Sequence, residues 1–352
     1  MVIFKNEYLY LMILVTGGTG LVGSHLLYDL AKTGKKVKAL KRAGSDTKVV
    51  LKTFSYYSDQ AKELFAHIEW VEGDIMDYFS LLEALKDVTE IYHCAAKVSF
   101  SPKDQETMLK TNVEGTANMV NAALEKGIRK FCHISSIATL GKSEKEEITE
   151  ESYWKSTGEN SVYSLSKYAA EREVWRAAEE GLPVIIVNPA IILGPGNWNQ
   201  TSSNLFKRAH QGILFYTNGG SGFVDVRDVS KAMLQLMNSE LINERFILSS
   251  ENYPFKQFFD LLHEQLGKEK SSIHASSFLS AVAWRAEKIR TTFTGKPSLI
   301  TKETARAANR KSFYSNGKIK ALGYSFIPIE QSIKDTCKLF LTDLPDSPSN
   351  LN

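Results

Sequence analysis

The stretch TGGTGLVG, residues 16–23, decides the fold expected for this chain. It follows the apolar run Met12–Thr16, which is typical of a buried strand, and opens Leu21–Lys32, whose apolar spacing predicts a helix. In such a unit, glycines make the tight turn, admit a pyrophosphate to the backbone, and bring the helix close to the strand. The helix N-terminus offers amides to the phosphates. We therefore predict a dinucleotide site, rather than a merely structural turn, with contacts from Gly17, Thr19, Gly20, Leu21, Val22 and Gly23.

Strand-like and helix-like runs alternate as far as Pro189. Further strands are predicted at residues 36–40, 67–71, 90–94, 131–135 and 184–188, and further helices at 112–126 and 163–180. This alternation predicts an α/β fold with a doubly wound parallel sheet, the Rossmann arrangement.

The alternation of strand-like and helix-like runs stops after Pro189, where polar residues and a Gly-Pro-Gly turn follow. A helix is predicted near 229–238. The strand predicted after it, at 245–249, would join the sheet as a late strand. We therefore expect a dinucleotide-binding domain of residues 1–188 and 222–250. Residues 189–221 and 251–352 would form a smaller, mainly helical substrate lobe.

Composition narrows the class of protein. The 352 residues carry 43 Lys and Arg against 40 Asp and Glu, and a net charge of +3 gives no reason to expect a nucleic acid partner. No apolar run reaches the roughly 18 residues of a membrane-spanning helix. Three distant cysteines indicate free thiols and a cytoplasmic protein. The scattered histidines predict no metal site.

The end of the second strand points to a cofactor. NAD enzymes usually carry an acidic residue about 20 residues beyond the glycine loop. Lys41 and Arg42 stand there instead, and a guanidinium suits a 2′-phosphate, so NADP(H) is preferred over NAD(H). Lys48 would add a second positive charge, although a solvated basic strand end is the alternative reading. Asp74 would accept a hydrogen bond from adenine, or simply form a Gly-Asp turn.

Tyr163 and Lys167 form a candidate catalytic pair. They lie one helical turn apart on the same face of a predicted helix. A lysine cation nearby would lower the pKa of a tyrosine, ordinarily about 10, toward the physiological range. Ser136 follows a predicted strand and would emerge at the same edge of the sheet. Asn112 is a further candidate, although a helix cap explains it equally well.

Several motifs together resemble the extended short-chain dehydrogenase/reductase superfamily, in its NAD-dependent epimerase/dehydratase group. They stand in family order: TGGTGLVG, HCAA at 93–96, NVEGT at 112–116, SSIATLG at 135–141, Tyr163 with Lys167, and residues 188–196. The resemblance implies that Tyr163 exchanges a proton with a substrate oxygen, that Lys167 lowers its pKa and holds the nicotinamide ribose, and that Ser136 binds the oxygen. Asn112, which opens the NVEGT motif, is the fourth candidate catalytic residue. We also expect contacts with the dinucleotide from Ile75, Ala95, Ala96, Lys97 and Pro189.

The resemblance is strongest to the dihydroflavonol 4-reductase-like branch. Dehydratases of the group carry an Asp-Glu pair where this chain has Ile137 and Ala138, and epimerases often have proline where Val162 stands. The resemblance therefore implies an NADP(H)-dependent carbonyl reductase or alcohol dehydrogenase acting on a small molecule. A nucleotide-sugar epimerase and a non-catalytic NADP-binding sensor remain alternatives. A homodimer is compatible with this reading.

The substrate pocket is expected between the sheet edge and the second lobe. Its predicted walls are residues 97–100, 190–193 and 197–206, with Phe100, Ile191, Leu205 and Phe206 as apolar contacts. A nucleotide sugar would instead require Lys207, Arg208 and Arg227 to converge beside Tyr163. The amphipathic segment 278–293 would serve as core, lid or membrane-surface helix.

Overall fold

Seven parallel strands form the main sheet, in the order β10-β6-β5-β4-β1-β2-β3. The computed structural model describes residues 12–141, 147–156, 160–276 and 302–344, together with residues 279, 284, 285, 287 and 290. The strands are β1 (Met12–Thr16), β2 (Lys36–Lys41), β3 (Ile68–Glu72), β4 (Val88–His93), β5 (Lys130–Ile134), β6 (Val184–Pro189) and β10 (Glu244–Leu248). The doubly wound parallel sheet predicted from the sequence is confirmed.

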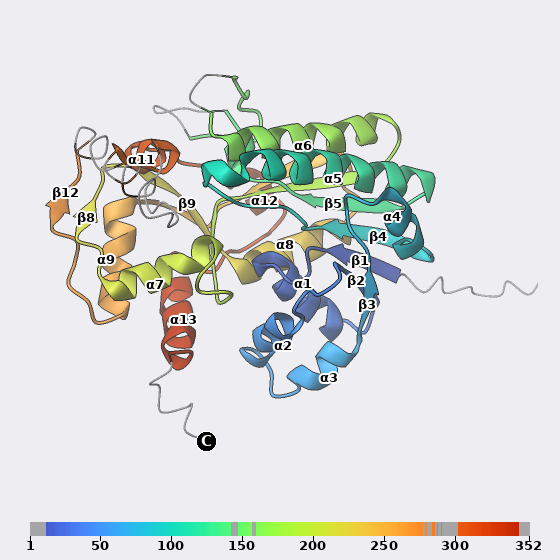
Figure 1. The fold of residues 1–352 in the computed structure, drawn as a ribbon, viewed down its shortest axis with the longest axis horizontal. Helices are drawn as coiled ribbons and strands as arrows, with labels where there is room; N and C mark the ends of the chain where they lie inside the picture. Colours follow the sequence, from blue (N-terminus) through green and yellow to red (C-terminus); the bar gives the residue numbers. More distant parts are fainter. Residues whose placement is uncertain are drawn as a thin grey trace, which may run out of the picture.

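Helices cover both faces of this sheet (Figure 1). On one face lie α1 (Leu21–Lys32), α2 (Lys48–Ser55), α3 (Ala61–Ala66) and α8 (Val226–Met237). On the other lie α4 (Tyr78–Ala84), α5 (Gln105–Glu125) and α6 (Val162–Glu179). Two apolar layers result, and β6 is buried along its whole length because it faces both of them.

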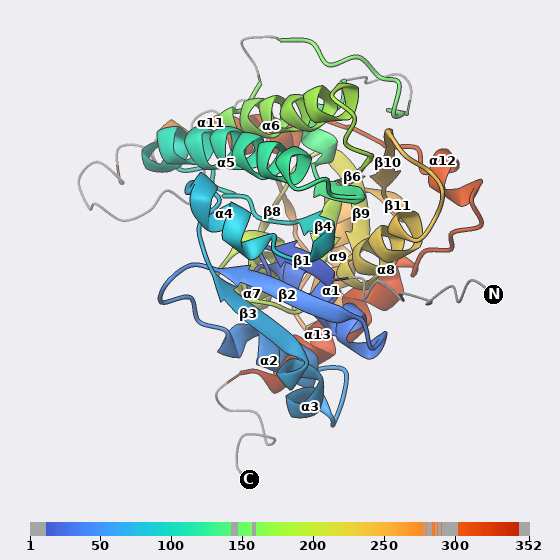
Figure 2. The same cartoon turned by 90° about the vertical axis from the view of Figure 1, so that its right-hand side faces the viewer.

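The remaining elements gather beside the sheet (Figures 1 and 2). A second sheet has the order β11-β9-β7, and Phe206, Phe223 and Phe258 are fully buried in a separate apolar core there. The elements are β7 (Ile191–Leu193), α7 (Asn204–Gln211), β8 (Phe215–Tyr216), β9 (Gly220–Asp225), β11 (Glu251–Pro254), α9 (Phe255–Gln265), β12 (Ile273–His274), α11 (Lys302–Asn309), α12 (Gly317–Lys320) and α13 (Ile329–Thr342). The predicted boundary at residue 222 falls inside β9, and the division into two domains stays a prediction.

The helix that contains Asn112 begins earlier than its sequence indicates. The predicted range was 112–126, but α5 starts at Gln105. The first turns carry few buried apolar side chains, Met108 among them, so their periodicity is weak. Asn112 lies in the body of the helix and is buried, so the alternative reading of Asn112 as a helix cap is wrong.

The glycine loop is held by contacts that exclude side chains. Gly17 has φ +67°, and a Cβ there would lie 2.6 Å from the backbone of Cys94 and Ala95. A Cβ on Gly23 would lie 2.2 Å from the carbonyl oxygen of Gly17. The amide of Gly20 donates to that same carbonyl at 2.9 Å, which closes the turn before α1. The first turn of α1 therefore packs directly against the end of β1.

Gly23→Ala should destabilise the protein. The added methyl group meets backbone rather than a flexible side chain, so the loop must shift, at a cost of about 1–3 kcal/mol. Urea unfolding of the variant and the wild type measures this loss.

Gly317→Ala is the matched control. A Cβ at this position has no neighbour nearer than 3.5 Å, and the free energy of unfolding should change by less than about 0.5 kcal/mol. Equal losses in the two variants would contradict the close packing described for Gly23.

Candidate active site

Tyr163 and Ser136 meet at the carboxyl edge of the main sheet. Ser136 follows the end of β5, and Tyr163 stands in the first turn of α6. Burial raises the pKa of Tyr163 above its ordinary 10.0, and a hydrogen bond with Ser136 partly offsets this effect. The phenol is therefore a proton donor at neutral pH, with a serine hydroxyl beside its oxygen.

Lys167 lies one turn further along α6 and is buried. Its Nζ donates to the carbonyl oxygen of Ile134 at 2.6 Å. Burial lowers the pKa of Lys167 from 10.5 to about 8, while Glu171 and Cys94 act in the opposite direction. The group therefore carries its charge at neutral pH and loses it under mildly alkaline conditions.

The expected effect of Lys167 on Tyr163 is absent. The sequence predicted that the lysine lowers the pKa of the tyrosine, but that pKa is raised, and only burial and Ser136 contribute clearly to its shift. The lysine ammonium is instead directed to the end of β5, at the Ile134 carbonyl. The helical spacing placed both residues on one face without fixing where the ammonium points.

Asn112 links the loop after β4 to α6. Its Oδ1 accepts from the amide of Lys97 at 2.7 Å, and its Nδ2 donates to the Lys97 carbonyl at 3.0 Å. Nδ2 also donates to Ser166 Oγ at 3.0 Å, and that hydroxyl donates to the Tyr163 carbonyl at 2.8 Å. Asn112 thus fixes the backbone of Lys97, at the end of the segment that contains Ala95 and Ala96.

The loop after β4 also contacts the glycine loop. Thr16 and His93 pair across β1 and β4, and Thr16 Oγ1 lies 2.8 Å from His93 Nδ1. The amide of Ala95 donates to Thr16 Oγ1 at 3.2 Å. The residue before α1, Gly20, has no side chain to bond the first amides of that helix. A cradle of glycines before uncapped amides fits a pyrophosphate.

The other residues predicted to bind the dinucleotide are spread along the same edge. Arg42 and Lys48 are exposed after β2, and neither forms an ion pair with the described residues. Lys41, in contrast, lies 3.7 Å from Glu72. Pro189 is buried at the end of β6, and the ammonium of Lys97 pairs with Asp104 at 2.8 Å.

Asp74 forms a local turn. Its Oδ1 accepts from the amide of Met76 at 3.0 Å, which is the Gly-Asp turn that the sequence left as the alternative to an adenine contact. Ile75 is buried against Gly115 in the apolar layer below α4 and α5. Both residues remain close to the end of β3, as predicted.

The predicted substrate walls are met only in part. The ring of Phe100 lies 5.7 Å from that of Tyr163, between ring centres, and is partly exposed. Phe206 is fully buried in the separate apolar core beside the second sheet, so its predicted role as a pocket wall is wrong. Segment 278–293 lies mainly outside the described residues, and its role stays untested.

Two buried polar residues were missed by the sequence analysis. Ser166 connects Asn112 to Tyr163, and Glu171 stands one turn after Lys167 with its carboxylate buried. The helical spacing from Lys167 to Glu171 was a usable signal, since it places Glu171 on the same face as the candidate pair Tyr163 and Lys167.

Other kinds of site find no support in the described ranges. Within them, no three histidine, cysteine or carboxylate side chains are grouped as a metal site would require. No described helix is both long and apolar enough to cross a membrane. Cys94, Cys132 and Cys337 are free thiols, as predicted.

Comparison with known proteins agrees with the fold and the motifs. Residues 13–248 match the family described as "NAD dependent epimerase/dehydratase family". A Synechocystis sp. protein provisionally named dihydroflavonol 4-reductase is 30% identical, over 93% of this chain and 93% of its own. Cinnamoyl-CoA reductase 1 of Petunia hybrida is 25% identical, over 93% of this chain and 91% of its own.

Two solved structures show the same architecture along nearly the whole chain. The crystal structure of gox2253 has a TM-score of 0.77 at 31% identity and covers 94% of this chain and 97% of its own. UDP-glucose 4-epimerase of Thermotoga maritima has a TM-score of 0.73 at 23% identity, over 94% of this chain and 98% of its own, and shows the fold alone. With two thirds of its length matched by the family model, the chain belongs to the NAD-dependent epimerase/dehydratase family.

Proposed function

We propose that the protein is an NADP(H)-dependent oxidoreductase that reduces a ketone or aldehyde to an alcohol, or catalyses the reverse reaction. The observation that carries the proposal is the contact of Tyr163 with Ser136 at the sheet edge, with Lys167 one turn away. Relatives named as reductases support the reaction class.

In reduction, Tyr163 donates its proton to the carbonyl oxygen as the carbon is reduced. Its raised pKa keeps the phenol protonated at neutral pH, as an acid requires. Ser136 donates a hydrogen bond to the same oxygen and so stabilises the charge that develops there. Lys167 would act through the cofactor rather than on the phenol, because its ammonium points to the Ile134 carbonyl and does not lower the pKa of Tyr163. The bound nicotinamide supplies the hydride.

The chain's own residues would hold the dinucleotide along the sheet edge. The glycine loop and the uncapped start of α1 suit the pyrophosphate, and Lys167 would hold the nicotinamide ribose. Ala95 to Lys97, fixed by Asn112, would form the next contact along the cofactor. The guanidinium of Arg42, which forms no ion pair within the described part of the chain, suits a 2′-phosphate and so favours NADP(H).

The two alternatives have less support. A nucleotide-sugar epimerase needs positive charge for a diphosphate, but Arg227 pairs with Asp225 at 2.6 Å and with Asp335 at 2.9 Å. Lys207 donates to Asn199 at 2.5 Å. A non-catalytic NADP sensor would not require the Tyr163 and Lys167 pair, and the chain retains both.

Tyr163→Phe should abolish carbonyl reduction and leave dinucleotide binding nearly unchanged, because only the phenol oxygen is lost. NADPH oxidation with a panel of aldehydes and ketones measures turnover, and fluorescence titration measures binding. Tyr168→Phe, on the same helix but stacked on Trp154, is the control and should retain activity. Full activity of Tyr163→Phe would exclude it as the acid.

The rate should fall at alkaline pH. Lys167 loses its proton as the pH rises through about 8, whereas the raised pKa of Tyr163 keeps the phenol protonated to higher pH. Below pH 8 both groups are protonated, so kcat/KM for reduction should be level and then fall by about tenfold per pH unit. In Lys167→Arg the guanidinium stays charged, and the residual activity should lack this fall. A level wild-type profile up to about pH 9.5 would contradict the role given to the charge.

NADPH should bind about tenfold to hundredfold more tightly than NADH, as expected for one charge-assisted hydrogen bond. Arg42→Asp should reverse this preference by replacing attraction for the 2′-phosphate with repulsion. Lys36→Asp, at the other end of β2, makes the same charge change and should leave the preference in place. Equal or tighter NADH binding by the wild type would refute this assignment of Arg42.

A further inference from the structure

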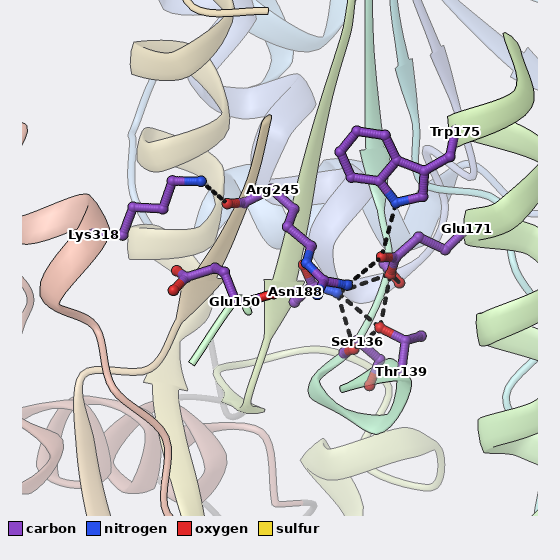
Figure 3. Close-up of polar contacts among 9 residues, drawn as sticks. Ser136, Thr139, Glu150, Glu171, Trp175, Asn188, Arg245 and Lys318 are labelled. Carbon is purple, nitrogen blue, oxygen red and sulfur yellow. Dashed lines mark hydrogen bonds and ion pairs between the residues drawn. The ribbon is translucent and has the colours of Figure 1, made fainter. Parts of the chain in front are cut away.

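Glu171 is a buried carboxylate surrounded by hydrogen-bond donors. Its side chain is 4% exposed, on the face of α6 that carries Tyr163 and Lys167. Oε2 accepts from Ser135 Oγ, from Thr139 Oγ1 at 2.7 Å and from Asn188 Nδ2 at 2.9 Å. Oε1 accepts from the Trp175 indole at 3.3 Å and from Arg245 at 3.2 Å. Figure 3 shows donors converging on both oxygens.

Two of these donors, Asn188 and Thr139, also contact the Ser136 carbonyl. The single hydroxyl hydrogen of Thr139 is shared between Glu171 and that carbonyl, whereas the Asn188 amide has two hydrogens. Asn188 Nδ2 lies 3.2 Å from the Ser136 carbonyl oxygen, and Thr139 Oγ1 lies 2.9 Å from the same oxygen (Figure 3). Asn188 comes from the end of β6 and Thr139 from the turn after β5, defined here as residues 135–139. Glu171 therefore connects α6 to the backbone of Ser136 through two side chains from other elements.

The charge of Glu171 is balanced inside the same cluster. An unpaired carboxylate at this depth would be strongly unfavourable. Arg245 of β10 supplies the opposite charge, and its other nitrogen donates to the Glu150 carbonyl. A cavity of about 210 Å³, lined in part by Trp154, Trp175 and Arg245, borders the outer side of the pair. Arg245 and the cavity lie on the side of Oε1, and Oε2 accepts the hydrogen bonds that hold the 135–139 turn.

The turn has few other attachments to α6. Ser164 Oγ donates to the Ala138 carbonyl at 2.5 Å, and Lys167 binds the Ile134 carbonyl just before the turn. Neither contact reaches the carbonyl of Ser136. The Ser136 hydroxyl itself accepts from the amide of Ala138 at 3.1 Å, so its direction depends on the shape of the turn.

We infer that Glu171 is a positioning residue, which fixes the Ser136 hydroxyl against Tyr163 by holding Thr139 and Asn188. This role rests on the proposed function, in which Ser136 and Tyr163 bind the reacting oxygen. Displacement of a catalytic group by about 1 Å can cost on the order of a hundredfold in rate. Glu171 therefore governs the rate without touching the substrate.

Glu171→Ala should lower kcat by about tenfold to hundredfold, while the dissociation constant for NADPH changes by less than about twofold. Glu171→Gln should recover only part of the rate. Its amide nitrogen can donate to the Ser135 and Thr139 hydroxyls, which can accept, but it faces the Asn188 amide nitrogen, which is also a donor, and the negative charge that raises the pKa of Lys167 is lost. Glu173→Ala, which removes only the neighbouring pair with Arg176, is the control and should behave as the wild type.

Hydrogen exchange tests the same role without activity. The amides of Ala138 and Thr139 are bonded to Ser136, so Glu171→Ala should speed exchange in the 135–139 turn and leave α1 unchanged. Thr139→Val removes one of the two links and should show a smaller local increase. It also replaces Glu171→Ala as the test should that variant fail to fold.

Unchanged exchange in the 135–139 turn would overturn the inference, as would a Gln variant as slow as the Ala variant. If the wild type reduces no carbonyl compound, the proposed function fails. The exchange measurement would then still decide whether Glu171 positions Ser136.

Discussion

The parallel direction of the strands is the constraint on which the site depends. Because β1, β4, β5 and β6 run the same way, the segments that follow them meet at one edge. The glycine loop, the loop to Lys97, the turn of Ser136 and the end at Pro189 are those segments. Residues far apart in sequence thus become neighbours without any long loop having to fold back.

The helices then convert this alignment into defined geometry. α6 places Tyr163, Lys167 and Glu171 on one face, so a single rigid element carries all three side chains to the edge. α5 carries Asn112 from the body of a helix, where packing on both sides fixes the amide. Sites on helices and strands hold such positions more tightly than sites on loops.

Burial sets the electrostatic character of the edge. Removing water disfavours both charged forms, and it raises the pKa of Tyr163 and lowers that of Lys167. Glu171 counteracts this effect on Lys167, and Arg245 in turn balances Glu171. The site therefore keeps a protonated phenol and a cationic lysine together at neutral pH, which suits proton donation to a carbonyl oxygen.

Local signals predicted much of this arrangement, and long-range contacts account for what they missed. β1 and α1 match their predicted bounds because the glycine loop between them ends the strand and precedes the helix. The start of α5 was missed because its first turns bury little apolar surface. Glu171 was missed because a glutamate on an amphipathic helix ordinarily faces water, and its partners Asn188 and Arg245 come from distant strands.

The most direct test of the account follows the hydride itself. The purified protein is incubated with carbonyl compounds and NADPH deuterated at the transferring position of the nicotinamide, and the alcohol is analysed by mass spectrometry. The account predicts one deuterium on the former carbonyl carbon of each product molecule, and none with Tyr163→Phe. Product without deuterium at that carbon, or equal labelling by the Tyr163→Phe variant, would contradict it.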